Sequence, residues 1–239
     1  MPAESTVHRL AGNAAADLLV RCTDVSHTYS SGSTAVVAVS QVSYDLYDGA
    51  RLAIMGPSGS GKSTLLHMMA GLETVTSGTV SWPAFGANPT GDPGQVGVVF
   101  QGPSLIPSLD AVGNIAFPLV LGGIPDAEAE RRARAALADL DLEWMSTRLP
   151  DELSGGQAQR VAIARVLATA PRLILADEPT GQLDRETGRH VIDVLIHAAD
   201  RLGAALVVTT HDPEVADRFS EGWLMNDGML RGKMKGERS

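Results

Sequence analysis

The sequence predicts an α/β domain with a mostly parallel sheet, a small antiparallel sheet near its start and a helical insertion. The first observation is that apolar, strand-like runs alternate with helical periodicity through the middle and C-terminal parts of the chain. The second is a cluster of short alternating patterns before the turn at Asp48-Gly49. The third is a glycine-rich loop that lies between an apolar run and a helical stretch.

Local patterns place these elements along the chain. Residues 18–22, 34–39 and 41–47 alternate in polarity, which predicts three short strands of an antiparallel sheet. Asp126 is expected to cap one helix and Ser154 the next, since both side chains accept hydrogen bonds from a helix start. The remaining expected elements are strands at 51–55, 173–176 and 206–210, helices at 62–71, 126–140 and 186–202, a loop at 82–95 and a hairpin at 226–228.

Length and composition favour one domain with a subdomain. The chain has 239 residues, of which 44% are apolar and 20% charged, as is usual for a globular core. We expect the folded domain to span residues 18–231, with a helical subdomain at about 102–165. Residues 1–17 and 232–239 are expected to be tails.

Charge and the single cysteine limit the classes of function. With 19 basic and 28 acidic residues the net charge is -9, which disfavours nucleic acid as a partner because phosphate contacts need clustered Lys and Arg. For Cys22 we expect a buried strand thiol in a reducing compartment, with catalytic use as the remote alternative. No apolar run approaches the roughly 18–20 residues that span a bilayer, and the start does not read as a secretory signal. We therefore expect a cytoplasmic protein whose membrane role would come through another chain.

The glycine-rich loop carries the clearest chemistry. Residues 56–63 read Gly-Pro-Ser-Gly-Ser-Gly-Lys-Ser, directly after an apolar strand and before a helix. The glycines let backbone N–H groups surround phosphate oxygens, and the helix start points its positive end at the same anion. Lys62 is expected to reach the β- and γ-phosphates, and Ser63 to bind Mg²⁺. The alternative, a glycine-rich turn with an incidental lysine, does not explain the position between strand and helix.

Two acidic residues follow the apolar run at 173–176. Asp177, at the end of a central parallel strand, would lie beside the phosphate loop and hold a water bound to Mg²⁺. Glu178 would orient the water that attacks the γ-phosphate. Taken alone, an apolar strand that ends in Asp-Glu also fits an ordinary strand end, and only the glycine-rich loop gives it a catalytic meaning.

A histidine and a second glycine pair extend the pattern. His211 ends the strand at 206–210, and we favour contact with the γ-phosphate over a structural role. Residues 153–157 read Leu-Ser-Gly-Gly-Gln, and two glycines after a capping serine make a second helix start able to bind an anion. Because one loop already serves the nucleotide of this chain, the second would serve another ATP. By spacing alone, this interpretation and an ordinary capped helix are equally supported.

In these motifs the chain resembles the ABC ATPase family over nearly its whole length. The resemblance identifies residues 56–63 as Walker A, 153–157 as the family signature and 173–177 as Walker B, in the family's order. It implies a P-loop NTPase core of the RecA-like type, with a mostly parallel sheet, an N-terminal antiparallel β subdomain and an inserted α-helical subdomain. Implied nucleotide-binding residues are Tyr29, Gly56, Pro57, Ser58, Gly59, Ser60, Gly61, Lys62, Ser63, Thr64, Gln101, Ser154, Gly155, Gly156, Gln157 and Asp184. Implied Mg²⁺ ligands are Ser63, Gln101 and Asp177, and implied catalytic residues are Glu178, His211 and Lys62.

The resemblance also implies an assembly. Two copies would form a head-to-tail dimer, with each ATP between the Walker A loop of one copy and residues 154–157 of the other. Tyr29 would stack on adenine, with an ordinary sheet or surface tyrosine as the alternative. Gln101 would touch Mg²⁺ or the attacking water and report on a membrane partner. That partner would be a permease in a separate chain, which would place the subunit at the cytoplasmic face of the membrane.

Within the family, the chain looks like the lipoprotein-release and macrolide-export type, whose partners are FtsX-like permeases. Residues 56–66, 70–72, 77–78, 99–101 and 176–184 carry this likeness. The chain departs from that type at Gln182 and Gly113, where Asn and Glu are usual, and in a shorter stretch between Val80 and Gln95. These departures concern the partner and the cargo and leave the ATPase motifs intact.

Three functions are compatible with the motifs. The first is an ATPase that drives a membrane transporter or a mechanotransmission complex. An importer ATPase for amino acids or similar solutes shares every catalytic residue. The third, a soluble ABC ATPase acting on DNA or ribosomes, is disfavoured because such proteins carry paired nucleotide domains, long coiled coils or zinc insertions, which the sequence lacks.

Overall fold

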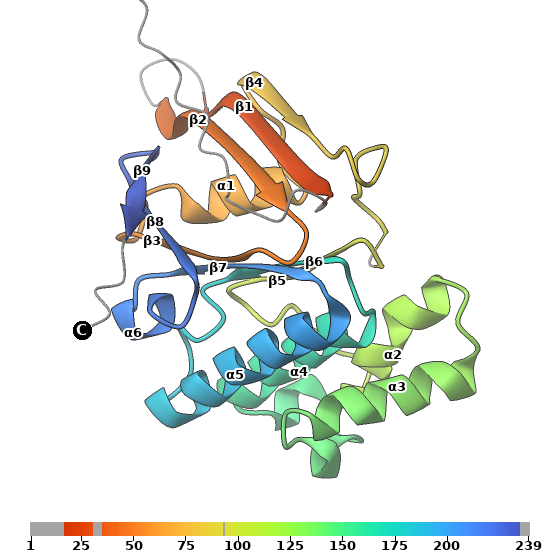
Figure 1. The fold of residues 1–239 in the computed structure, drawn as a ribbon. Coiled ribbons are helices and arrows are strands. Elements are labelled where there is room, and N and C mark those ends of the chain that lie inside the picture. The colour runs from red at the N-terminus through yellow and green to blue at the C-terminus, as the bar shows by residue number, and fades with distance from the viewer. Residues whose placement is uncertain (1–16, 31–34, 93, 235–239) are drawn as a thin grey trace, which may run out of the picture. The chain divides into compact units, whose positions relative to one another are not determined.

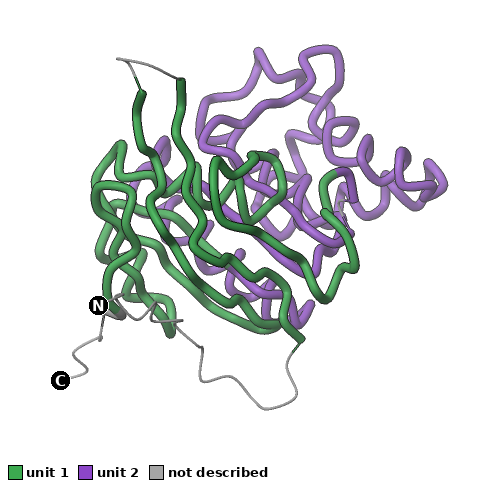
Figure 2. The backbone as a smooth tube through the Cα atoms, turned by 90° about the horizontal axis from the view of Figure 1, so that it is seen from above, with its two compact units in different colours: residues 1–90, 207–239 green, residues 91–206 purple. Residues whose placement is uncertain are grey.

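The computed structural model describes residues 17–30, 35–92 and 94–234. The chain forms two compact units: unit 1 comprises Met1–Thr90 and Val207–Ser239, and unit 2 comprises Gly91–Leu206 (Figure 2). Strand β7 (Ala205–Thr210) begins in unit 2 and ends in unit 1. Apart from Asp17, the tail expected at residues 1–17 lies outside the described residues.

Unit 1 contains an antiparallel sheet (Figure 1), in which β1 (Leu18–Tyr29) pairs with β2 (Val36–Tyr47) and β4 (Ser77–Ser81). The prediction of two strands at 34–39 and 41–47 was wrong, because β2 is continuous. Gln41 has a φ of 49° and lies at a shift in the β1–β2 register, so the polar interruption is a bulge within one strand.

Unit 1 also holds the strand that enters the glycine-rich loop. Strand β3 (Arg51–Met55) lies parallel to β8 (Glu221–Asn226) and is followed by helix α1 (Lys62–Met69). Strand β8 turns back into β9 (Met229–Met234), and Asp227 and Gly228 both have positive φ, as a two-residue hairpin turn requires. The predicted hairpin is confirmed, but β9 extends beyond residue 231, where a tail was expected to follow.

Unit 2 carries the helical insertion between β5 (Val96–Val99) and β6 (Leu173–Asp177), which are parallel. The insertion consists of α2 (Ala111–Leu121), α3 (Asp126–Ala138) and α4 (Gly155–Ala168), which pack on one another. Asp126 is not a cap, because Pro125 occupies the N-cap position and Asp126 is the first helical residue. Helix α2 was not predicted, since its Gly113 and Pro118 are poor helix formers.

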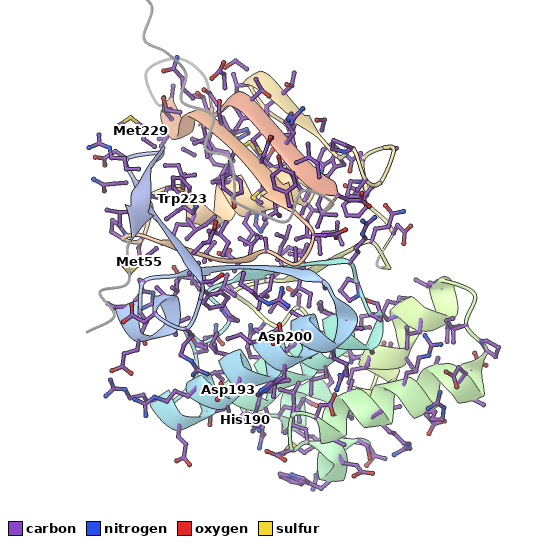
Figure 3. All side chains as sticks on the ribbon, viewed as in Figure 1. Met55, His190, Asp193, Asp200, Trp223 and Met229 are labelled. Carbon is purple, nitrogen blue, oxygen red and sulfur yellow. The ribbon has the colours of Figure 1, made fainter. Side chains whose placement is uncertain are left out.

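Helix α5 (Arg185–Leu202) is amphipathic. Val191, Leu195 and Ala199 are buried, while His190, Asp193 and Asp200 lie on the polar side (Figure 3). Gly203 closes the helix in the left-handed conformation. The short elements are η2 (Glu143–Met145), η3 (Pro150–Glu152) and α6 (Pro213–Ala216).

The aliphatic core matches the predicted fold class. Every residue of β6 and β7 is buried, as expected for parallel strands that are covered on both faces. The α/β class, the mostly parallel pairing, the N-terminal antiparallel sheet and the helical insertion are confirmed. Among the described residues, no helix has both the length and the apolarity needed to cross a bilayer.

The predicted burial of Cys22 is confirmed and leads to a testable property. The side chain is 3% exposed on β1, and burial raises the pKa of the thiol to about 12. Because the thiolate is the reactive form, we expect the native protein to resist alkylation by iodoacetamide at pH 8 and to be labelled after denaturation. Mass spectrometry of the two samples tests this, and rapid labelling of the native protein would contradict it.

Candidate functional site

The glycine-rich loop connects β3 to α1 through left-handed glycines. Gly59 has a φ of 79° and Gly61 a φ of 99°, a region that strongly favours glycine. Gly61 is the N-cap of α1, and a Cβ there would overlap the carbonyl oxygen of Ala38. At Gly56, a Cβ would overlap the carbonyl oxygen of Met225. The glycines therefore allow the loop to turn between two neighbouring backbones.

The loop presents a cation and an unsatisfied hydroxyl. Lys62 is 4% exposed, and its Nζ donates to the carbonyl oxygens of Gly56 at 2.9 Å and Pro57 at 3.0 Å. Ser60 Oγ is buried and has no partner among the described residues. An orphaned buried hydroxyl is costly, and a phosphate oxygen would satisfy it. The left-handed glycines, the lysine and the hydroxyl together fit a phosphate group at a helix start.

His211 follows directly on a residue that contacts this loop. The backbone N–H of Gly56 donates to the carbonyl oxygen of Thr210 at 3.3 Å. Asp212 caps the short helix α6 through a hydrogen bond from Glu214 N. His211 itself is exposed. Unit 1 therefore brings the end of β7 to the first residue of the loop, as the sequence led us to expect.

Tyr29 reaches the same helix from β1. Its hydroxyl lies 3.2 Å from Thr64 Oγ1, and its ring meets the ring of His27 edge-on, with centroids 4.4 Å apart. His27 is in turn fixed by a contact of 2.7 Å between Nδ1 and the carbonyl oxygen of Thr74. With 43% of its surface exposed, Tyr29 is held in place while retaining free aromatic surface on which a base could stack.

Unit 2 holds the two acidic residues at the end of β6. Asp177 is 3% exposed, whereas Glu178 is partly exposed. Glu178 has a φ of 43°, which is an uncommon and strained backbone conformation for a glutamate. Its carbonyl oxygen accepts a hydrogen bond from Gly181 N at 3.0 Å, so the chain turns sharply after the strand. Such strain is typical of functional positions.

The predicted second helix start has the expected cap. Ser154 Oγ accepts from Gln157 N at 3.3 Å, and Gln157 Oε1 accepts from Ser154 N at 2.8 Å, which forms a capping box. A Cβ on Gly156 would come within 3.0 Å of the Leu183 side chain, and one on Gly155 within 3.6 Å of Gln182 Oε1. The residues that precede α5 therefore lie against the glycines that open α4.

Asp184 is engaged as the N-cap of α5. Its carboxylate accepts from Thr187 N at 3.0 Å and from Thr187 Oγ1 at 2.6 Å. These hydrogen bonds, that of the hydroxyl above all, lower the pKa of the Asp184 carboxyl, so it is ionised at neutral pH. Gln101, the remaining predicted residue, is exposed immediately after Phe100 at the end of β5.

The residues predicted from the sequence thus fall into two sets. Unit 1 contains the phosphate loop, Tyr29 and His211, and unit 2 contains Gln101, the residues at 154–157, the acidic pair and Asp184. Sequence reasoning missed Ala38, Met225 and Gly228, whose backbones hold the loop; Gly228 N donates to Ser60 O at 3.0 Å. Backbone contacts of this kind depend on tertiary structure and carry no side-chain signal.

For a metal ion, the described residues offer no cluster of three or more His, Cys, Asp or Glu side chains. Mg²⁺ in phosphate sites is commonly held by one or two protein oxygens together with phosphate and water. The Ser63 hydroxyl and the buried Asp177 carboxylate are oxygen donors of the required kind. Unit 1 and unit 2 therefore each supply one oxygen donor of the kind that an ion arriving with a nucleotide requires.

Comparison with known proteins gives a consistent result. A family model described as ABC transporter matches residues 39–181. The dimeric post-hydrolysis state of the ATP-binding cassette MJ0796 bound to ADP and Pi is 36% identical, with a TM-score of 0.84 over 91% of this chain and 98% of that one. A second dimeric structure of MJ0796, described as a bacterial ABC transporter cassette, has a TM-score of 0.83 with the same identity and coverage. The cbiO1 protein from Clostridium perfringens, part of the ABC transporter complex cbiONQ, is 27% identical, with a TM-score of 0.77 over 91% of this chain and 88% of that one.

Replacement of the loop lysine tests the phosphate assignment. In Lys62→Ala the phosphates lose their main cation, so we expect ATP affinity to fall by about tenfold or more. Isothermal titration or a fluorescent ATP analogue measures the change. Arg131→Ala removes a positive charge from the exposed side of α3 and should bind as wild type. Unchanged ATP affinity in Lys62→Ala would remove the loop from nucleotide binding.

Proposed function

The chain belongs to the ABC transporter family, and on this premise we propose that it is the subunit that powers a membrane transporter or a mechanotransmission complex by ATP-dependent dimerisation. It is an ABC-type ATPase with a nucleotide-binding domain. The observation that carries the proposal is that two helices of one chain, at Lys62 and at Gly155, begin directly after or within a glycine-containing segment, where a helix start could bind an anion. One ATP needs only one of them, so the second is available to the ATP of another copy.

The residues of each copy would divide the reaction between them. Residues 56–64 of one copy would bind the phosphates of ATP, and Tyr29 would stack on adenine. Residues 154–157 of the other copy would meet the γ-phosphate from the opposite side. This arrangement makes ATP part of the dimer interface, so binding would close the dimer and hydrolysis would release it. The two dimeric structures of the related cassette MJ0796 support this proposal.

For the chemical step we assign roles to the residues that follow the strands. Glu178 would orient and deprotonate the attacking water, and His211 would contact the γ-phosphate. Gln101 would contact the water or the ion, and Asp184 would act near the second copy's nucleotide. Mg²⁺, held through Ser63 and Asp177, would supply charge neutralisation for the phosphates.

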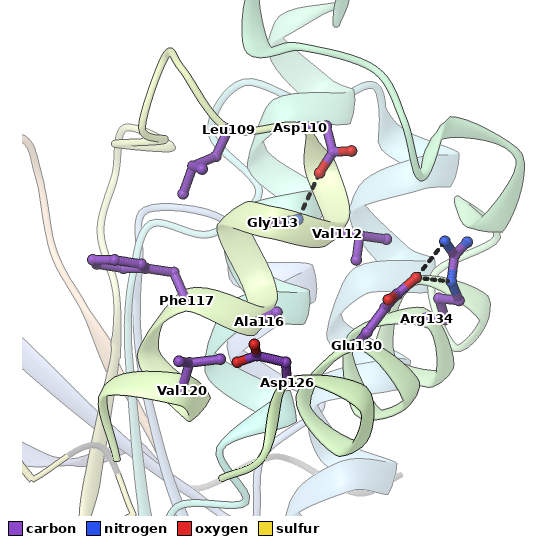
Figure 4. Close-up of a pocket in the computed structure, with 10 residues that line it drawn as sticks. All are labelled: Leu109, Asp110, Val112, Gly113, Ala116, Phe117, Val120, Asp126, Glu130 and Arg134. Carbon is purple, nitrogen blue, oxygen red and sulfur yellow. Dashed lines mark hydrogen bonds and ion pairs between the residues drawn. The ribbon is translucent and has the colours of Figure 1, made fainter. Parts of the chain in front are cut away.

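A groove lined by residues of α2 and α3 is the surface at which we expect a protein partner to bind. It is an open hollow of about 400 Å³, lined on its apolar side by residues such as Leu109, Phe117 and Val120 (Figure 4). Phe117 is 43% exposed and Val120 is 40% exposed. Asp126 also lines the groove, and a basic group could pair with it there. We assign the groove to a short segment of a permease that carries one large apolar side chain beside a basic residue.

The identity of the permease is a further part of the proposal. The motifs at residues 56–66 and 176–184 favour an FtsX-like partner in a lipoprotein-release or macrolide-export type of system. Gly113 lines the groove at the position where that type usually has an acidic residue. The partner's segment would therefore not meet an acidic side chain at this position. An importer ATPase for amino acids or similar solutes is the second candidate, since it would share every catalytic residue. In either case the subunit would lie at the cytoplasmic face of the membrane.

Glu178→Gln tests the chemical assignment. The amide cannot accept the proton of the attacking water, so we expect ATP hydrolysis to slow by about a hundredfold or more while ATP still binds. Size-exclusion chromatography with ATP should then show a trapped dimer. Glu186→Gln, in the first turn of α5, is the matched control and should hydrolyse ATP normally. Turnover near the wild-type rate in Glu178→Gln would exclude Glu178 as the catalytic base.

Phe117→Ser tests the groove. Loss of the ring from the hollow should abolish recovery of a permease from detergent-solubilised membranes, while ATP affinity stays unchanged. Trp144→Ser is the control, because Trp144 is 69% exposed but does not line the groove. Equal recovery of the permease by Phe117→Ser and wild type would contradict the docking assignment. Recovery of ribosomes or DNA in place of a permease would overturn the transporter proposal.

A further inference from the structure

The segment between β5 and α2 connects two functional regions of unit 2. It begins at Phe100, continues with the exposed Gln101, and ends at Leu109 and Asp110, which line the groove. The segment has no helix or strand of its own. Apart from one backbone hydrogen bond within it, from Leu109 N to Ile106 O at 3.1 Å, the segment is held by side chains that bind its backbone.

Two side chains of α4 bind the first half of this segment through its carbonyl oxygens. Gln159 Nε2 donates to Phe100 O at 3.0 Å. Arg165 donates through Nη1 to Ser104 O at 2.9 Å and through Nη2 to Pro103 O at 3.3 Å. Partial burial lowers the pKa of the Arg165 guanidinium.

The second half of the segment is held by Asn114 on α2. Its amide nitrogen donates to Ile106 O at 3.1 Å, Leu109 O at 2.8 Å and Asp110 O at 3.1 Å, and its oxygen accepts from Ile106 N at 2.7 Å. Asn114 is 1% exposed. All of its donors and acceptors within the described residues serve this segment, so its two halves are fixed to two packed helices.

The hydrogen bond from Gln159 to Phe100 comes with an unsatisfied buried oxygen on the same side chain. The residue is 1% exposed, and its Oε1 is buried without a partner among the described residues. A leucine would fill the same space without an unsatisfied acceptor. The amide is therefore poorly explained by packing and well explained by the single bond that it donates to Phe100 O.

The hydrogen bond from Gln159 to Phe100 O also constrains Gln101, the next residue in the chain. The carbonyl of Phe100 and the nitrogen of Gln101 belong to one rigid peptide plane. A donor that fixes the Phe100 oxygen therefore fixes the plane from which the Gln101 side chain departs. Gln159 lies only four residues after Gly155, about 6 Å along the helix from the start of α4.

We propose that Gln159 is a positioning residue that links the orientation of Gln101 to helix α4, which begins after Ser154. When a second copy's nucleotide binds at the start of α4, Gln159 would orient Gln101 for hydrolysis through the Phe100 carbonyl. This inference rests on the proposed function of Ser154 and Gln101. The same bonded segment leads on to Asp110, so a partner in the groove acts on the same backbone. Because Gln159 is 1% exposed, it would act through the Phe100 carbonyl and not by contact with the nucleotide.

Gln159→Glu tests this role through pH. An ionised carboxylate cannot donate to Phe100 O, whereas the neutral acid can, and burial of a carboxyl raises its pKa. We expect kcat for ATP hydrolysis to fall by about tenfold at pH 8.5 and to recover toward wild type at pH 6, each compared with wild type at the same pH. The KM for ATP should not change, because the nucleotide contacts remain.

Gln159→Leu decides the question if the glutamate variant does not fold. It removes both the donor and the unsatisfied acceptor, so we expect a Tm no lower than wild type and a kcat reduced by about tenfold at every pH. Gln95→Leu is the matched control, because Gln95 also has a buried, unpartnered Oε1 in unit 2 but bonds Asp92. It should hydrolyse ATP at the wild-type rate.

The outcomes separate this inference from the proposed function. A kcat within about twofold of wild type in Gln159→Leu, or a loss in Gln159→Glu that does not depend on pH, overturns the positioning role. Slow hydrolysis with normal ATP affinity and pH recovery in Gln159→Glu supports it. If wild-type protein fails to bind ATP, or Lys62→Ala binds it equally well, the nucleotide site itself is wrong, whatever the Gln159 variants do.

Discussion

The site depends on the close approach of Gly61 to the carbonyl oxygen of Ala38. At a φ of 99° and with no space for a Cβ, only glycine lets the backbone turn there and begin α1 at Lys62. Met225 near the end of β8 and Gly228 in the turn before β9 also contact the loop through their backbones. Segments from near both ends of the chain thus hold one loop, which places the Lys62 cation and the Ser60 hydroxyl where a phosphate can bind.

Three helix starts in the molecule are capped in different ways, and the difference fits their proposed roles. Helix α1 begins at Gly61, which offers no side-chain cap, so its start is available to an anion. Helix α4 begins with a capping box between Ser154 and Gln157, and α5 with the carboxylate of Asp184. Because these two starts are partly satisfied by their own side chains, an incoming phosphate at α4 would have to add to or replace an existing bond.

Much of the site could be predicted because its residues are close in sequence. Residues 56–63 and 153–157 have fixed spacing, and each directly opens a helix that the structure confirms. The positions at which prediction failed have a common physical cause. Gln41 interrupts the polarity of β2 through a bulge, and α2 contains Gly113 and Pro118, which tertiary packing nevertheless holds in a helix.

The sequence by itself determined the fold class and the positions of the glycine-rich loop and of the capped helix start at Ser154, because spacing, glycine content and apolar periodicity are local properties. Tertiary structure alone decided which backbones hold those motifs. The contacts of Gly61 with Ala38 and of Gln159 with Phe100 join residues far apart in the chain through carbonyl oxygens. Every residue has a carbonyl, so no side-chain pattern in the sequence could have marked these partners in advance.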